Sequence, residues 1–157
     1  MFKASMQDFA KLKDSLEAIS SLITEGNFRI TKDGIRLVAM DPASVAMVIL
    51  DVLPSAFLTY ECDGDHSINL NITNFVTILK RAKANDMITL DLSDDKMRIT
   101  MKGNVKRTFS LPIIVSADEE QKVPELDFKG KIEMDAEVMK DGIKDASMVS
   151  DLSLIHI

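Results

Sequence analysis

The sequence predicts an α+β fold in which two helices lie on one side of a mainly antiparallel sheet. Two segments repeat apolar residues at helical spacing, and many short segments alternate apolar with polar residues. Turn residues separate these segments at close intervals, as they do in antiparallel sheets. The 157 residues, 46% of them hydrophobic, suffice for a substantial core.

The first half of the chain is predicted to open with a strand over residues 2–6 that leads into a helix. One apolar stripe marks this helix: Phe9, Leu12, Leu16, Ile19 and Ile23. Residues 27–31 and 35–40 alternate around a turn in which Gly34 permits a positive φ, which indicates a hairpin. Residues 45–52 are almost continuously apolar, which predicts a strand covered on both faces.

The second half is predicted to contain one more helix among further strands. That helix covers residues 72–83, and its apolar stripe consists of Phe75, Ile78, Leu79 and Ala82. The strands are predicted over residues 57–62, 67–71, 87–92, 97–102 and 105–115. The order of elements is therefore β-α-β-β-β-β-β-α-β-β-β.

A repeat relates the two ends of the chain. Residues 12–20 return as residues 139–147 at a constant offset of 127, and each copy follows a short predicted strand, 2–6 or 131–134. A period this long favours two domains of one design. We expect an N-terminal domain over 1–115, an acidic linker over 116–128 and the start of a second, similar domain over 129–157.

Charge and cysteine content exclude several classes of protein. The net charge of −6 argues against a protein that coats nucleic acid with a uniformly basic surface. Cys62 has no cysteine partner, which fits a reducing compartment and excludes an internal disulfide. No apolar run is long enough to cross a membrane, and residues 1–10 carry no secretory signal, so we expect no membrane partner.

Several recognisable sequence motifs are spread over most of the chain. The longest, residues 33–48, has the sequence DGIRLVAMDPASVAMV, and shorter ones are MFKA at 1–4, ILKRA at 78–82 and VPELDF at 123–128. Together with residues 140–151 they resemble the proliferating cell nuclear antigen family, the DNA sliding clamps. The loop Asp41-Pro42-Ala43-Ser44 is similar to that of archaeal members.

The resemblance implies a subunit of a ring of three, each subunit having two similar domains, threaded by double-stranded DNA of any sequence. Such clamps catalyse no reaction and need no cofactor. They tether DNA polymerase, ligase and nucleases for replication and repair, and a clamp loader opens the ring. Whether the trimer is homomeric stays open. The expected location is the cytoplasm on the nucleoid in an archaeon, or the nucleus in a eukaryote.

In the family, helices that line the ring face DNA phosphates, and basic residues of the three predicted helices lie away from the apolar stripes at about 100° per residue. The resemblance therefore assigns DNA contacts to Lys11, Lys13, Lys80, Arg81, Lys83, Lys140 and Lys144. The alternative is that these residues form the solvated faces of ordinary amphipathic helices. Asp14, Glu137 and Asp141 share those faces and dilute the positive charge.

The resemblance also implies an apolar pocket that takes a short partner peptide by aliphatic and aromatic anchors. It assigns this pocket to Met40, Ser44, Val45, Met47, Val123, Pro124 and Phe128. Methionine suits a surface that repacks against different partners. The alternative is that these are ordinary core and linker residues.

Residues 105–115 resemble the edge strand that, in clamps, pairs with the second domain of a neighbouring subunit. The corresponding interface residues are Lys106, Thr108, Ser110 and Pro112. Because the second domain is only begun here, we expect the full-length parent, and not this chain, to close into a trimer.

Two carboxylate clusters suggest a metal-dependent nuclease or hydrolase as the alternative function. They are Asp91, Asp94 and Asp95, and Asp63, Asp65 and His66. Both clusters lie in predicted turns, where Asp is favoured because it bonds the local backbone. We therefore expect no metal site and no enzymatic activity.

Residues 152–157 depart from the clamp pattern. They can be encoded by CTGTCTCTTATACACATC, which resembles the end sequence of a transposase-based sequencing adaptor. The sequence thus predicts a non-native tail on a parent molecule cut within its second domain.

Overall fold

The structure is a computed structural model that describes residues 1–93, 95–115 and 122–149. It divides the chain into two units, Met1–Val123 and Pro124–Ile157. Residues 152–157, which form the predicted non-native tail, lie outside the described residues. Among the described residues, no helix combines the length and apolarity that a membrane crossing requires.

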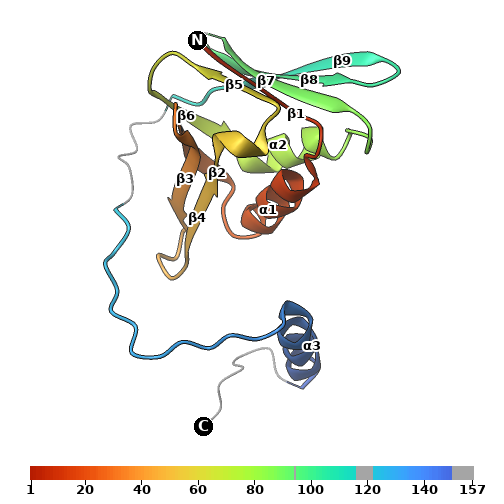
Figure 1. The fold of residues 1–157 in the computed structure, drawn as a ribbon. Coiled ribbons are helices and arrows are strands. Elements are labelled where there is room, and N and C mark those ends of the chain that lie inside the picture. Colours follow the sequence, from red (N-terminus) through yellow and green to blue (C-terminus); the bar gives the residue numbers. More distant parts are fainter. Residues whose placement is uncertain (94, 116–121, 150–157) are drawn as a thin grey trace. The chain divides into compact units, whose positions relative to one another are not determined.

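In the described part of the first unit, two helices and nine strands follow one another in the order that the sequence predicts (Figure 1). In chain order its elements are β1 (Phe2–Met6), α1 (Ala10–Ser20), β2 (Glu25–Thr31), β3 (Gly34–Met40), β4 (Met47–Val52), a 3-10 turn (Pro54–Ala56), β5 (Thr59–Cys62), β6 (His66–Asn71), α2 (Ile72–Leu79), β7 (Met87–Ser93), β8 (Lys96–Lys102) and β9 (Lys106–Pro112). The second unit contains α3 (Ala136–Ser147).

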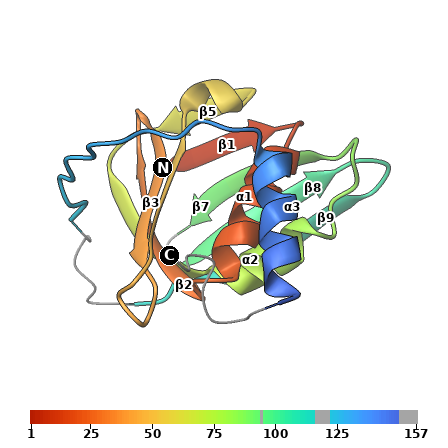
Figure 2. The ribbon, with the colours of Figure 1, turned by 90° about the horizontal axis from the view of Figure 1, so that it is seen from below.

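The strands form two antiparallel sheets, which confirms the predicted α+β fold of antiparallel sheets with two helices. One sheet has the order β5-β1-β7-β8-β9 and the other the order β4-β3-β2-β6. Both views show α1 and α2 side by side against these sheets (Figures 1 and 2). Alternation along a strand indicates that one of its faces is buried, but it does not indicate which strand is its neighbour. The pattern of side chains therefore could not predict the number of sheets.

The core lies between the two sheets and the helix pair. Leu16 and Ile19 of α1 are buried, and so are all members of the apolar face of α2 from Ile72 to Leu79 except the half-buried Ile78. The rings of Phe28 in β2 and Phe75 in α2 meet edge to face at 6.4 Å. The predicted apolar stripes of both helices are thereby confirmed.

Polar contacts also connect the sheets. The Tyr60 hydroxyl of β5 donates to the Thr31 carbonyl of β2 at 2.6 Å, and burial raises the pKa of Tyr60 to about 12. Beyond β9, the Ile114 N–H donates to the Asn69 carbonyl of β6 at 2.8 Å. The two sheets are therefore fixed to each other at their edges as well as through the core.

Three predicted segments differ in the structure. The strand predicted over residues 45–52 begins at Met47 and is an edge strand with half of its side chains outward, so it is not covered on both faces. The second helix ends at Leu79, which leaves Arg81 and Lys83 in the following turn. Residues 131–134 form no strand and are exposed, because no partner strand lies within the described part of the second unit.

Replacing Leu16 with alanine tests the importance of the helix packing. Leu16 is fully buried, so we expect Leu16→Ala to lower the free energy of unfolding by about 2–5 kcal/mol. Urea denaturation followed by circular dichroism measures the change. Leu22→Ala is the control, since Leu22 is 48% exposed and we expect a loss below about 1 kcal/mol. Equal losses in the two variants would contradict the proposed packing.

Candidate functional site

Three of the predicted DNA contacts belong to α1 or directly follow α2. Lys11 is exposed, and Lys13 is partly buried and paired with Asp14 at 3.2 Å. Lys80 directly follows α2, and its ammonium lies 2.7 Å from the Glu17 carboxylate of α1. The structure thus brings Lys11, Lys13 and Lys80 to one pair of helices, with acidic groups between them.

The turn after α2 is held in place by a partly buried ion pair that the sequence did not reveal. The Arg107 guanidinium of β9 donates to the Asp86 carboxylate and, at 2.8 Å, to the Arg81 carbonyl. The same carboxylate accepts the Lys83 backbone N–H at 3.0 Å, and Asp86 is only 4% exposed. Because one guanidinium bridges both ends of the turn, the exposed side chains of Arg81 and Lys83 project from a fixed backbone.

A glycine permits this close approach. A Cβ at Gly103, in the turn between β8 and β9, would stand 2.0 Å from the Asp86 carboxylate oxygen. The signal that could have revealed the pair is the period of two in β9, which places Arg107 on the same face as Phe109 and Leu111. An arginine on the inward face of a strand needs a buried partner.

The remaining predicted DNA contacts lie in the second unit. Asp135 caps α3, its carboxylate accepting the Glu137 N–H at 2.8 Å. Lys140 is exposed, and Lys144 lies 3.3 Å from Asp141 one helical turn earlier. The basic residues of α3 thus share their face with acids, as those of α1 do.

The loop between β3 and β4 presents Val45 to solvent. The Asp41 carboxylate accepts the backbone N–H groups of Val45 at 2.7 Å and Ala46 at 2.8 Å. Chiefly through the bond from Ala46, this lowers the pKa of Asp41 below its ordinary value of 3.8. Ser44 adopts a φ of 57°, in the left-handed region, and Val45 is left 86% exposed.

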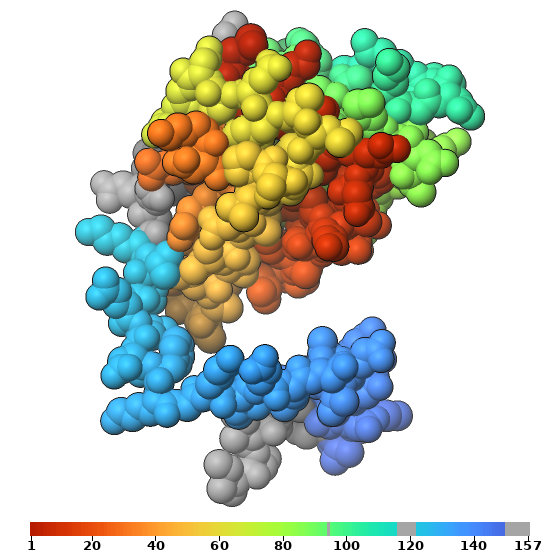
Figure 3. Space-filling model, in the orientation of Figure 1, coloured from red at the N-terminus to blue at the C-terminus, as the bar shows by residue number. Residues whose placement is uncertain are grey.

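An apolar strip runs from this loop along the outer face of β3 and β4. Cross-strand pairing places Met40 opposite Met47 and Val38 opposite Ile49. Ile49 is exposed, Met40 and Met47 are half-buried, and Val38 is buried. The hairpin that carries them projects from the first unit (Figures 1 and 3). The structure therefore gathers the predicted pocket residues Met40, Ser44, Val45 and Met47.

The linker residues of the predicted pocket lie at the boundary between the two units of the chain. Val123 ends the first unit, while Pro124 and Phe128 belong to the second. All three are exposed, Phe128 by 78%. Ile49 and Val38 were not predicted as pocket residues, although period two from Met40 and Met47 indicates them.

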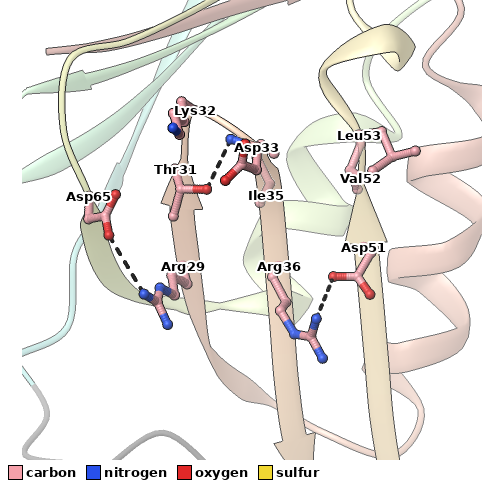
Figure 4. Close-up of a pocket in the computed structure, with 11 residues that line it drawn as sticks. Arg29, Thr31, Lys32, Asp33, Ile35, Arg36, Asp51, Val52, Leu53 and Asp65 are labelled. Atoms are coloured by element: carbon pink, nitrogen blue, oxygen red, sulfur yellow. Dashed lines mark hydrogen bonds and ion pairs between the residues drawn. The ribbon is translucent and has the colours of Figure 1, made fainter.

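A polar pocket lies farther along the same outer face, near the turn between β2 and β3 (Figure 4). Arg36 pairs with Asp51 at 3.5 Å, and Arg29 lies 3.6 Å from Asp65. Lys32 and Asp33 complete its charged lining, so the basic and acidic residues balance. The charged lining of the pocket therefore carries no net charge.

The edge of the larger sheet is formed by β9, which pairs with β8 and, within the described residues, has no partner strand on its other side. Four side chains point away from the core: Lys106, Thr108, Ser110 and Pro112. The strand thus presents a mainly polar edge of seven residues.

The carboxylates of the alternative metal sites are engaged in ion pairs. Asp91 lies 3.7 Å from Arg98 and Asp95 lies 3.6 Å from Lys96, while Asp94 lies outside the described residues. In the other cluster, the Asp63 carboxylate pairs with the N-terminal ammonium, and it lies 3.7 Å from Nε2 of His66. Within residues 1–93, 95–115 and 122–149, no group of three or more His, Cys, Asp or Glu could hold a metal ion.

A family model described as the N-terminal domain of proliferating cell nuclear antigen matches residues 1–138. The chain belongs to the proliferating cell nuclear antigen family. The "DNA polymerase sliding clamp" of Nanoarchaeum equitans is 36% identical over 152 residues, and "DNA polymerase sliding clamp 1" of Thermococcus kodakarensis is 40% identical over 151. The alignments cover 95% and 96% of this chain.

The resemblance stated from the sequence is thereby confirmed, and the proliferating cell nuclear antigen fold is found in the structure too. The crystal structure of PCNA from Thermococcus kodakaraensis superposes with a TM-score of 0.84 at 21% identity, covering 96% of this chain and 62% of that one. The chain spans 61% of the length of each of the two curated relatives.

The lowered pKa of Asp41 makes the loop sensitive to acid. A depressed carboxyl pKa stabilises the folded loop above the ordinary value of 3.8, and this is lost as the pH falls through the lower, folded value. We expect the Val45 and Ala46 amide resonances to shift together below pH 3.8 in an NMR titration. Asp41→Asn keeps an acceptor oxygen but removes the titration. An unchanged pH profile in that variant would refute the assignment.

Proposed function

We propose that the chain is the N-terminal part of a sliding-clamp subunit that encircles duplex DNA and recruits replication and repair enzymes without catalysing a reaction. The observation that carries the proposal is the match of the family model to residues 1–138. The names of the curated relatives, DNA polymerase sliding clamps of archaea, support the same role. In the cell such a protein would be associated with archaeal DNA.

DNA binding is proposed at the outward face of α1, the turn after α2 and the basic side of α3. The exposed Lys11 and Lys80 and the braced backbone of Arg81 and Lys83 support this assignment. Flexible lysines that contact phosphates carry no sequence information and weaken steeply with salt. Such contacts suit a ring that moves along DNA of any sequence.

Partner proteins are proposed to dock a peptide segment on the apolar strip of β3 and β4. The exposed Val45 at the loop tip and the paired Met40 and Met47 support this. Val123, Pro124 and Phe128 complete the pocket in the proposal, since the linker carries exposed apolar side chains. Polymerases, ligases, nucleases and the clamp loader are the proposed partners.

Ring closure is proposed through β9 of one full-length subunit and the second domain of the next. The unpaired polar edge at Lys106, Thr108, Ser110 and Pro112 supports this. The second domain is proposed to start after a linker over 116–128. The exposed apolar residues Met139 and Ile143 of α3 correspond by the repeat to Leu12 and Leu16, which lie on the face that α1 packs against the core.

Replacing Lys83 tests the DNA face. We expect Lys83→Ala to weaken the binding of a labelled duplex and to reduce the slope of log K against log salt by about 0.9, because one phosphate contact is lost. Fluorescence anisotropy at several salt concentrations measures both. Lys32→Ala, an exposed change in the turn between β2 and β3, alters the net charge equally and should leave the slope unchanged. The proposal fails if both variants behave alike or if binding depends on DNA sequence.

Replacing Val45 tests the peptide pocket. A carboxylate at the loop tip would be desolvated by an apolar anchor, so we expect Val45→Glu to weaken capture of a peptide with aliphatic and aromatic anchors at least about tenfold. Isothermal titration calorimetry measures the affinity. Leu58→Glu, at another exposed apolar residue of the first unit, is the control and should bind normally. Equal affinities for the two variants would place the peptide site elsewhere.

A further inference from the structure

Glu17 makes a close ion pair across two helices at the proposed DNA face. Its carboxylate oxygen lies 2.7 Å from the Lys80 ammonium. The side chains of Lys80 and Glu17 are 52% and 48% exposed. A ligand in solution can therefore reach the ammonium that Glu17 holds.

The pair contributes little to folding. The helices are held together by the buried faces that contain Leu16, Ile19 and Phe75. Ion pairs exposed to this degree contribute roughly 0–1 kcal/mol, because solvent screens them and two long side chains lose freedom. The pair matters instead for charge, since a phosphate that approaches Lys80 must displace a carboxylate.

The internal repeat indicates which way position 17 faces. At the offset of 127, Lys13 and Asp14 recur as Lys140 and Asp141, while the place of Glu17 is taken by Lys144. Lys144 lies on the face of α3 that we propose for DNA. Because Glu17 corresponds to Lys144 in the repeat, Glu17 lies on the equivalent face of α1. The first copy of the repeat thus has an acidic residue where the second copy has a basic one.

We propose that Glu17 is a positioning residue that acts through Lys80 and tunes DNA affinity by competing with phosphate for the ammonium group. This inference rests on the proposed function. Glu17 keeps the contact of Lys80 with DNA weak and quickly exchanged, because its carboxylate replaces the phosphate as soon as the phosphate departs. The chain thus carries both the attraction to DNA and a built-in limit on it.

The experiment measures duplex binding by the 157-residue chain and its variants by fluorescence anisotropy across salt concentrations. We expect Glu17→Gln to bind roughly 2–5-fold more tightly and to steepen the salt slope by about 0.9, since one more phosphate contact forms. Glu17→Lys, which copies the second repeat, should bind more tightly still. In a Lys80→Ala background, Glu17→Gln should lose this gain.

Asp51→Asn is the matched control, because it removes the same charge from a 50% exposed carboxylate paired with Arg36 on the outer sheet face. An equal gain in this control would show an effect of net charge alone and overturn the inference. Unchanged or weaker binding by Glu17→Gln would also overturn it. The expected gain cannot come from damage to the fold, because such damage lowers affinity. If Lys83→Ala has no effect, the DNA face itself is wrong and both proposals fall. A normal Lys83→Ala loss without the Glu17 gain rejects the inference alone.

Discussion

The packing of α1 and α2 against the space between two sheets is the constraint on which the rest of the structure depends. Each helix buries one apolar face, represented by Leu16 in α1 and Phe75 in α2. The opposite face of α1 must then remain in water and carries Lys11, while Lys80, Arg81 and Lys83 follow the end of α2. The surface proposed for DNA is thus a consequence of how the core is filled.

Polar contacts at the periphery turn that packing into defined positions. The guanidinium of Arg107 connects β9 to the turn after α2, so one arginine links the proposed subunit edge to the proposed DNA face. In the other sheet, the Asp41 carboxylate shapes the loop that exposes Val45. Each proposed surface therefore rests on a charged side chain that forms hydrogen bonds with the backbone.

The balance of charge on the helices suits weak, repeated contact better than tight binding. Lys13 pairs with Asp14, Lys80 with Glu17 and Lys144 with Asp141. A purely basic face would bind polyanions strongly and slowly release them. The three acidic partners instead favour quick exchange with phosphates, as the proposed movement along DNA requires.

The sequence by itself determined the order of strands and helices, the apolar stripes and the family, because these depend on local periodicity and on collinear motifs. Only the tertiary structure decided that the strands form two sheets, that β4 is an edge, and that Asp86 meets Arg107 across 21 residues. It also paired Glu17 with Lys80. These features depend on which distant segments pack together, and a side-chain pattern along one strand or helix does not encode that choice.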